Sequence, residues 1–282
     1  MSAFSAAWLA EREEADVRAR CPALVAVLPS APSAIVDLGS GTGSNLRWLA
    51  PRLGAGQQWT LVDNDAALLA TARRSLGNWA SAAGYRLSDD DDDIAIAGAG
   101  FECSVRLVEL DLASGLEALD LPASGLVTAS ALLDLVSADW LESLVSRIAT
   151  SRSSALFALS FDGRVAFEPA MAEDAMIVSL LNRHQLTDKG FGPALGPDAW
   201  CTAARLFEAS GFDVRVAESD WQCDANDGAM LQTLIDGWVD CAVSMVPDSG
   251  RALRNWRRQR LNQVGRRDIR VVVGHRDLVA VP

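Results

Sequence analysis

Three glycines spaced by single residues stand where the backbone could pass close to a small ligand. Residues 34–38 are typical of a buried strand, and apolar residues recur at helical spacing from Leu46 onward. Gly39, Gly41 and Gly43 lie between the two. Glycine lacks a Cβ atom, so it allows both a sharp turn and a close approach to a ligand. The spacing therefore predicts a ligand-binding turn between a strand and a helix.

The spacing of these glycines narrows the kind of ligand. A dinucleotide-binding turn carries the pattern G-x-G-x-x-G, but Ser44 stands three residues after Gly41. A phosphate-binding loop needs a Lys followed by Ser or Thr, and no such pair follows the glycines. The turn is therefore not typical of a dinucleotide or nucleoside triphosphate site.

Polar residues also follow the predicted strands at their carboxyl ends. Asp63 ends the run 58–62, where an open α/β sheet carries the acid that accepts hydrogen bonds from ribose hydroxyls. Asp65 is better placed to cap the next helix. The carboxyl ends of parallel strands share one edge of the sheet, and ligands bind there. We therefore expect four residues to converge, one after each of four strands: Asp37, Asp63, Asp111 and Ser130.

The stretch 36–43, VDLGSGTG, resembles the first motif of the class I S-adenosylmethionine-dependent methyltransferases. The resemblance covers mainly residues 34–160. In that family the glycine loop approaches the methionine part of the cofactor, and the acid matching Asp37 helps to hold its amino end. An acid past the third strand accepts from the adenine amino group while the next backbone N–H meets the ring. Asp111 and Leu112 match these places. The cofactor-binding residues that the resemblance implies are Asp37, Gly39, Ser40, Gly41, Gly43, Asn45, Asp63, Asn64, Asp111, Leu112 and Ser130.

Strands that alternate with amphipathic helices indicate an α/β protein with a buried parallel sheet. With the resemblance, this predicts a Rossmann-like, doubly wound sheet of seven strands, mostly parallel, with helices on both faces and an antiparallel last strand. Helical insertions are expected after strands five and six. The expected strands are 34–38, 58–62, 101–110, 126–130, 155–160, 212–217 and 269–281, with a bend at Gly274. Residues 88–100 are expected to form a solvated loop.

We expect one methyltransferase domain across residues 1–282. Its parts are an N-terminal helical cap (1–33), a cofactor-binding half (34–160), a lid-like insertion (161–197) and a C-terminal half (198–282) with inserted helices at 228–264. Methyltransferases commonly place their substrate lid after the fifth strand, so the insertion is the candidate for acceptor recognition. Pro169 is expected to start its helix, and Asp198 to cap the helix that follows.

Methyl transfer is an in-line displacement, so it needs an acceptor atom held close to the methyl group and a route for any proton on that atom. Asp134 and His184 are the titratable residues best placed to orient or deprotonate an acceptor. Asp134 could equally be a polar residue near a helix start, and His184 a satisfied core histidine. Asp188 and Lys189 are weaker candidates in the same polar segment as His184.

Several acceptor classes lack their usual motifs. No Pro-Pro-aromatic motif follows the fourth strand, there is no Pro-Cys dipeptide, and neither His nor acid clusters offer a metal site. A small-molecule O or N acceptor remains.

Two alternatives stay open. One is methylation of RNA or protein through the eight arginines between Arg251 and Arg270, although an amphipathic helix with a charged outer face is the simpler interpretation. The other is a cofactor-binding regulatory protein without catalysis.

The overall charge argues against some partners. With 37 Asp and Glu against 25 Lys and Arg, the formal charge is −12, which repels nucleic acid and anionic membranes. No apolar run is long enough for a signal peptide or a membrane span, so we expect a cytoplasmic protein. The five cysteines form no C-x-x-C pair, so neither a zinc cluster nor a disulfide framework is expected. The helices after residue 227 could form a homodimer surface.

Overall fold

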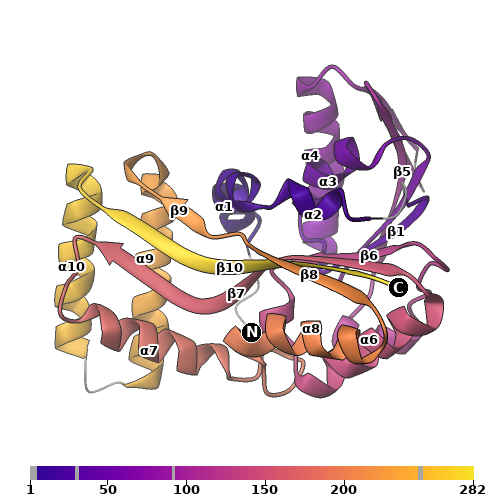
Figure 1. The fold of residues 1–282 in the computed structure, drawn as a ribbon. Helices are drawn as coiled ribbons and strands as arrows, with labels where there is room; N and C mark the ends of the chain where they lie inside the picture. The colour runs from indigo at the N-terminus through magenta and orange to yellow at the C-terminus, as the bar shows by residue number, and fades with distance from the viewer. Residues whose placement is uncertain (1–4, 29–31, 91–92, 247–249) are drawn as a thin grey trace.

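One mixed β-sheet organises the chain in the computed structural model, which describes residues 5–28, 32–90, 93–246 and 250–282 (Figure 1). The strands are β1 (Ala34–Leu38), β2 (Gln57–Asp63), β3 (Arg86–Asp89), β4 (Ile94–Gly98), β5 (Phe101–Glu109), β6 (Leu126–Ser130), β7 (Ser154–Glu168), β8 (Asp213–Glu218), β9 (Trp221–Cys223) and β10 (Arg270–Val281). Their order is β3-β4-β5-β2-β1-β6-β7-β10-β8, and β9 pairs with β10 beside this path.

The centre of the sheet is parallel, and its C-terminal side is antiparallel. Strands β5, β2, β1, β6 and β7 pair in parallel, whereas β10 runs antiparallel to β7, β8 and β9. The strand order changes direction between β1 and β6, which is the place where open α/β sheets bind ligands. The predicted Rossmann-like α/β class and the antiparallel last strand are confirmed.

Helices cover both faces of the sheet. They are α1 (Ala6–Ala19), α2 (Pro22–Val25), α3 (Ser44–Leu53), α4 (Ala66–Ala82), α5 (Leu112–Gly115), α6 (Ala138–Ser151), α7 (Asp174–Gln185), α8 (Ala199–Ala209), α9 (Gly228–Met245) and α10 (Gly250–Arg266). Alternate residues of β1 point to opposite faces. Val36 packs in the core with α6 and α8, whereas Ile35 packs in the core with α3 and α4.

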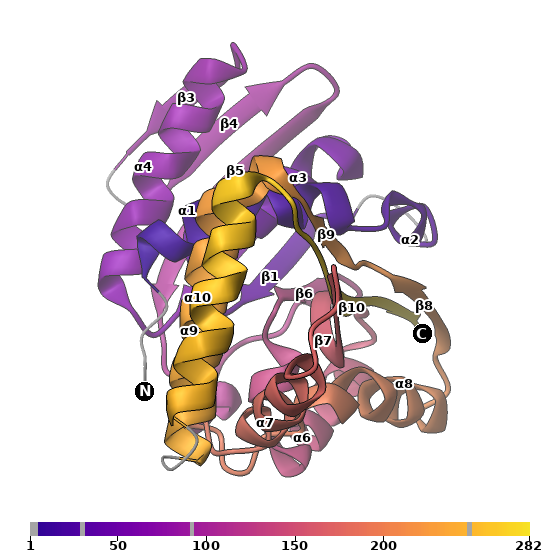
Figure 2. The ribbon, with the colours of Figure 1, turned by 90° about the vertical axis from the view of Figure 1, so that its left-hand side faces the viewer.

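The outer halves of β7 and β10 form a long antiparallel ribbon that carries a third group of helices. In Figure 1 this ribbon extends away from the parallel strands towards α7, α9 and α10. In Figure 2 α10 lies in front of α9, against which it packs. Leu231, Trp238, Leu253 and Trp256 fill a separate apolar core there. The apolar faces of these two helices are therefore used within the chain.

The sheet has three strands more than predicted. The loop expected at residues 88–100 is wrong for the described part of that stretch, because β3 and β4 form a hairpin on the edge of β5. Residues 91 and 92 lie outside the described residues. Ile94 and Ile96 are buried in the hairpin. The acidic run before them in the sequence predicts an exposed segment, so the sequence did not indicate this burial. The strand expected at 155–160 continues to Glu168, where it pairs with β10. The short β9 was not predicted.

Local signals at helix ends were mostly informative. Asp65 caps α4 by accepting from the N–H groups of Ala67 and Leu68, as predicted. Asp198 precedes α8 but its side chain makes no cap hydrogen bond, so that prediction was wrong. Pro169 does not start a helix either, because α7 begins at Asp174 and a cis peptide bond precedes Pro169.

The expected irregularity in the last strand is present. The pairing of β10 with β7 shifts register between Val273 and His275. A Cβ atom at Gly274 would lie 2.1 Å from Oδ1 of Asp162, so the close approach of the two strands requires glycine there.

Candidate functional site

The glycine turn has a backbone that only glycine adopts readily. Gly39, Gly41 and Gly43 have φ angles of 63°, 54° and 76°, all in the left-handed region that a Cβ atom disfavours. The Ser40 N–H donates to the carbonyl oxygen of Val62 at 2.9 Å, which fastens the turn to β2. The predicted turn is confirmed as a backbone shape. Its ligand stays a prediction.

The N-terminal helix lies against this turn. A Cβ atom built on Gly41 would meet Cδ1 of Leu9 at 3.0 Å. Since Leu9 belongs to α1, residues from the first part of the chain close one side of the turn. This contact is compatible with the N-terminal helical cap that the sequence predicts for residues 1–33.

Asp37 is the most unusual carboxyl group near the turn. It is fully buried, and Oδ1 accepts from Nδ2 of Asn45 at 2.7 Å. Its other oxygen, Oδ2, has no hydrogen-bond partner among the described residues. Burial raises the pKa of Asp37 to about 7, because a low-polarity environment disfavours the charged form. A ligand that donates a hydrogen bond or carries a positive charge would satisfy this oxygen.

A buried polar network holds Asn45 in place. Nη1 of Arg20 donates to Oδ1 of Asn45 at 2.7 Å, and Nδ2 of Asn45 also donates to Oγ1 of Thr128. Arg20 lies over the Trp48 ring, 3.9 Å from its centroid. Burial lowers the pKa of Arg20 to about 10. Arg20 therefore positions Asn45, and through it Asp37, from the N-terminal segment.

Asp63 links two strand ends. Its Oδ2 accepts from the Gly41 N–H at 2.8 Å and its Oδ1 from the Asp65 N–H at 3.0 Å. Burial raises the pKa of Asp63. Each carboxylate oxygen keeps a second lone pair, so the predicted ribose contact is compatible with these bonds.

The remaining predicted cofactor residues differ in their surroundings. Asp111 is exposed and caps α5, with Oδ1 accepting from the Ala113 N–H at 3.0 Å and Oδ2 from Oγ of Ser114 at 2.9 Å. Leu112 is buried, and its carbonyl accepts from Nε1 of Trp140. Ser40 is buried with an unpartnered Oγ, Ser130 is half-buried and Asn64 is exposed.

Sheet order decides which of these residues meet. β1 lies between β2 and β6, with Leu38 opposite both Val62 and Ala129. The glycine turn is therefore flanked by Asp63 on one side and Ser130 on the other. Asp111 follows β5, one strand beyond β2. The predicted convergence of the four strand ends on one edge is confirmed, whereas their roles in binding stay predictions.

Asp134 lies in a short 3₁₀ turn, η2 (Leu133–Leu135), directly after β6. It is buried, and Oδ1 has no hydrogen-bond partner in the described chain. Burial raises the pKa of Asp134 to about 6, although hydrogen bonds from backbone N–H groups, including that of Phe161, oppose this shift. A carboxyl group with a pKa near neutrality is suited to exchange protons with a ligand.

His184 and Lys189 lie together. The sequence ranked Lys189 below His184 as a candidate, but the structure places Lys189 in contact with His184 and close enough to act on Asp134. Nζ of Lys189 donates to the His184 carbonyl at 2.9 Å and lies 3.3 Å from Nδ1 of its ring. Burial, and then the Lys189 charge, lowers the pKa of His184. The Lys189 charge also acts on Asp134 and lowers its pKa. No hydrogen bond between described residues joins His184 to Asp134.

The polar segment after α7 is fastened beside Asp134. The Leu195 N–H donates to the Val136 carbonyl at 2.8 Å, and the rings of Phe191 and Trp140 meet edge to face at 5.2 Å between centroids. Ala194 forms a β-bridge with Ser137. This segment thus covers the end of β6, where the sequence expected an acceptor lid.

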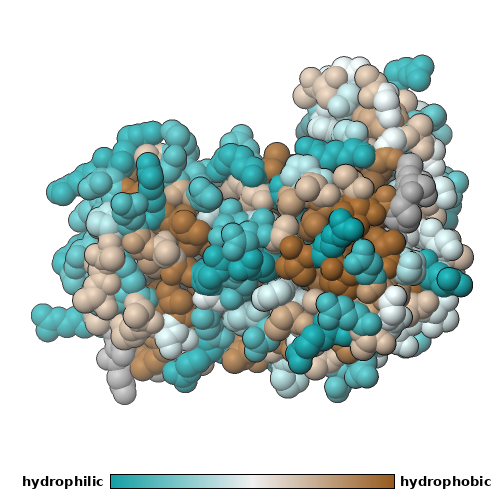
Figure 3. Space-filling view, viewed as in Figure 1, coloured by the Kyte–Doolittle hydropathy of each residue, from teal (hydrophilic) through white to brown (hydrophobic). Residues whose placement is uncertain are grey.

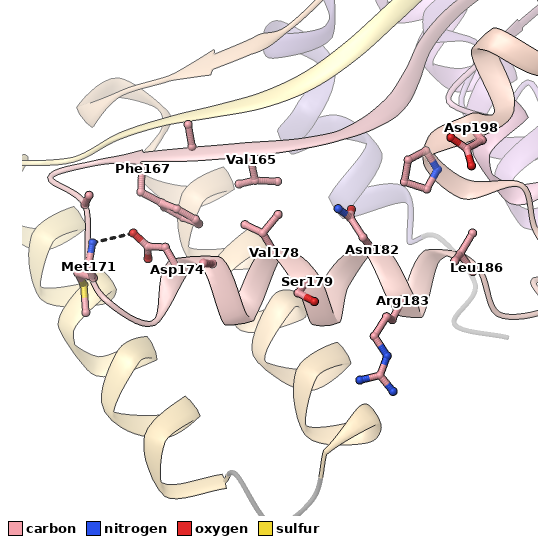
Figure 4. Close-up of a pocket in the computed structure, with 14 residues that line it drawn as sticks. Val165, Phe167, Met171, Asp174, Val178, Ser179, Asn182, Arg183, Leu186 and Asp198 are labelled. Atoms are coloured by element: carbon pink, nitrogen blue, oxygen red, sulfur yellow. Dashed lines mark hydrogen bonds between the residues drawn. The ribbon is translucent and has the colours of Figure 1, made fainter.

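A groove of about 890 Å³ lies elsewhere, between α7 and the outer half of β7 (Figure 4). Val165 and Phe167 point from the strand towards Val178 on the helix. None of its lining residues is a predicted cofactor residue or Asp134. Oδ1 of Asn182 in the groove is buried and lacks a hydrogen-bond partner among the described residues. At the strand ends three such atoms occur, on Asp37, Ser40 and Asp134, so we place the candidate site there.

The arginine cluster is partly used within the chain. Arg260 is buried and pairs with Asp174, Arg257 pairs with Asp236 at 2.7 Å, and Arg267 donates to Asn226. Leu253 and Trp256 on the same helix are buried, so the amphipathic-helix interpretation is confirmed.

On the face drawn in Figure 3, hydrophilic side chains separate two apolar areas.

The central part of the sheet has the strand order β5-β2-β1-β6-β7-β10-β8, and β10 is antiparallel to its neighbours. This is the Rossmann-like fold of the class I methyltransferases. No protein-family model matches the chain, and no curated protein matches it. Within the described residues, no helix is long and apolar enough to cross a membrane, and no group of three or more His, Cys, Asp or Glu side chains could hold a metal ion.

Solved structures with a methyltransferase fold resemble the chain at low identity. One is the cyclopropane synthase MmaA2 from Mycobacterium tuberculosis, with 10% identity, a TM-score of 0.46 and coverage of 92% of this chain and 82% of that one. Another is a SAM-dependent methyltransferase from Thiobacillus denitrificans in complex with S-adenosyl-L-homocysteine, with 14% identity, a TM-score of 0.44 and 99% coverage of both chains. A third is a candidate sarcosine dimethylglycine methyltransferase from Galdieria sulphuraria, with 14% identity, a TM-score of 0.41 and coverage of 92% of this chain and 81% of that one.

Sequence reasoning missed two residues of this region. Arg12 and Arg20 lie in the N-terminal segment that the sequence predicted only as a helical cap. Both are buried, yet their neighbours in the sequence include exposed charged residues of the same types. Only their packing against β9 and α3 distinguishes them, so no signal in the sequence marked them.

Proposed function

We propose that this chain is an S-adenosylmethionine-dependent methyltransferase that acts on an O or N atom of a small-molecule acceptor. The observation that carries the proposal is the buried Asp37 carboxylate next to a turn of three left-handed glycines, whose Oδ2 has no hydrogen-bond partner among the described residues. A cationic amino group and a nearby nucleoside would fit these two features together. The residues therefore fit the cofactor that the sequence implied.

Each part of the cofactor would meet a different strand end. Asp37 would accept from the amino group, Asp63 from the ribose hydroxyls, and Asp111 from the adenine amino group. Leu112 would offer its backbone N–H to the ring. The remaining residues proposed to line the pocket are Gly39, Ser40, Gly41, Gly43, Asn45, Asn64 and Ser130.

The bound cofactor would supply a methyl group on a sulfonium centre, which is the electrophile of an in-line displacement. Asp134 would accept the proton of the acceptor atom, because its buried carboxyl has a free oxygen and a pKa of about 6. The segment fastened to Ser137 and Trp140 would exclude water from that atom. His184 at the end of α7 and Lys189 in the segment after it would orient the acceptor, and the positive charge of Lys189 would favour an electron-rich acceptor group.

Calorimetry with S-adenosylmethionine and S-adenosylhomocysteine tests the binding step. Wild-type protein should bind both, and Asp63→Ala should bind at least tenfold more weakly. Glu142→Ala is a matched control, because Glu142 is an exposed acid on α6 outside the site. If wild type bound neither ligand and Asp63→Ala behaved in the same way, the proposal would be wrong.

Turnover separates an enzyme from a non-catalytic cofactor-binding protein. Release of S-adenosylhomocysteine on addition of a small-metabolite fraction supports catalysis. Cofactor that stays bound and methylated in every fraction favours the non-catalytic alternative.

A further inference from the structure

A nearly buried arginine near the glycine turn has two guanidinium nitrogens that form no hydrogen bond with another described residue. Arg12, on α1, is 8% exposed. Its Nε donates to Oδ2 of Asp16 at 2.9 Å, and no hydrogen bond joins Nη1 or Nη2 to another described residue. Neither atom is among the buried unpartnered atoms, so both reach solvent-accessible space. An arginine this buried usually has its donors paired.

The guanidinium group is held by its other contacts. Its central carbon lies 5.0 Å from the centroid of the Trp221 ring. Nε1 of Trp221 donates to Oδ1 of Asp16 at 2.9 Å, so the same tryptophan fixes the acid that binds Nε. Asp16 therefore orients the Nε edge of the guanidinium group, and the Trp221 ring covers one of its faces. The edge formed by Nη1 and Nη2 makes no hydrogen bond with another described residue. A planar pair of N–H donors fixed in this way matches a carboxylate or phosphate group.

Arg12 also lies beside the candidate site. Leu9, one helical turn before Arg12, is the residue in contact with Gly41. The Arg12 charge lowers the pKa of Asp134 and, after burial, that of His275, which falls to about 3. His275 is thus neutral, and Asp16 engages Arg12 only through Nε. Arg12 therefore lies near both the glycine turn and Asp134.

We propose that Arg12 binds an anionic group, a carboxylate or a phosphate, through Nη1 and Nη2 beside the glycine turn and Asp134. This inference rests on the proposed function for the identity of the site. Two sources of the anion are chemically equivalent: the carboxylate of the cofactor, or an anionic group on the acceptor. In either case Arg12 acts by binding and orientation, not by proton transfer.

The test compares wild type with Arg12→Gln, which removes the charge, and with Arg12→Lys, which keeps the charge but loses the planar pair of donors. The double variant Arg12→Gln/Asp16→Asn avoids leaving an unpaired buried acid if the single variant unfolds. Arg18→Gln is the control, because Arg18 lies on the same helix, half-exposed, and pairs with Asp227. Thermal shift establishes first that each variant is folded.

Four probes distinguish the sources of the anion: S-adenosylhomocysteine, 5′-methylthioadenosine, which lacks the amino-acid part, inorganic phosphate and acetate. A tenfold or larger loss for S-adenosylhomocysteine in Arg12→Gln, with methylthioadenosine unchanged, supports the cofactor carboxylate. Unchanged S-adenosylhomocysteine binding, with a phosphate- or acetate-dependent thermal shift in wild type that the variant lacks, supports an acceptor anion. Equal responses of wild type and both single variants to all four probes would overturn the inference. Failure of wild type to bind S-adenosylhomocysteine would refute the proposed function, while the phosphate and acetate arms would still test Arg12.

Discussion

Oδ2 of Asp63 accepts a hydrogen bond from the Gly41 N–H at 2.8 Å, so the end of β2 holds the turn that follows β1. The same carboxylate also accepts from the Asp65 N–H at the start of α4. One side chain thus fixes the positions of two backbone segments that face the candidate site.

Replacement of Asp63 by Ala should lower stability as well as ligand affinity. Two backbone N–H groups would lose their acceptor, and an unsatisfied buried donor costs about 1–3 kcal/mol. We expect the free energy of unfolding, measured by urea denaturation, to fall by roughly that amount, and Glu142→Ala to change it little. Equal values for the two variants would show that the Asp63 hydrogen bonds do not stabilise the turn.

Gly41→Ala tests how closely α1 approaches the glycine turn. The new Cβ would sit at φ 54° and 3.0 Å from Cδ1 of Leu9, so strain and crowding combine. Gly56→Ala is the matched control, since Gly56 has φ 79° but nothing within 4 Å of the position of a Cβ. Left-handed strain alone costs about 1–2 kcal/mol. In chemical denaturation Gly41→Ala should lose more stability than Gly56→Ala, and an equal loss would mean that the Leu9 contact adjusts freely.

Asp37 should make the protein less stable as the pH rises from about 4 to about 7. Its folded pKa of about 7 lies above the ordinary value of 3.8, so in this range the folded state holds a proton that the unfolded state has released. Stability therefore falls with increasing pH. Asp37→Asn should reduce the difference in the free energy of unfolding between pH 5 and pH 8. An undiminished difference would mean that Asp37 ionises normally in the folded protein.

Cofactor binding should change the protonation of Asp37. A cationic amino group beside Oδ2 would favour the ionised carboxyl and lower its pKa. Near pH 6, binding should then release a proton, which calorimetry in buffers of different ionisation enthalpy detects. Asp37→Asn should abolish this part of the proton release. Binding of S-adenosylhomocysteine without proton release at pH 6 would contradict the predicted contact.

Asp134→Asn should slow methyl transfer by roughly a hundredfold or more, the usual contribution of a general base. Asparagine keeps an oxygen that can accept from the Phe161 N–H, so folding and cofactor affinity should change little. Wild-type activity should rise as the pH increases through about 6, because the carboxyl must lose its proton to act, and the variant should lack this rise. Asp139→Asn, an exposed acid nearby on α6, is the control. Normal activity of Asp134→Asn would leave Asp134 a structural residue.

The sequence by itself determined the features that depend on near neighbours. The Asp65 cap joins residues two and three apart, and the left-handed glycine turn follows from residue type alone, so both were predictable. The parallel strand ends were predictable as well, because apolar runs alternate with amphipathic helices and such strands share one ligand-binding edge.

Only the tertiary structure decided which distant groups meet. Arg12 gains its fixed orientation from Trp221, more than two hundred residues later in the sequence, and Asp134 gains its raised pKa from burial beneath segments that follow it. The β3–β4 hairpin likewise depends on the burial of Ile94 and Ile96 through pairing with β5. Residue type and spacing specify a local hydrogen bond, but burial and long-range pairing are properties of the packed chain.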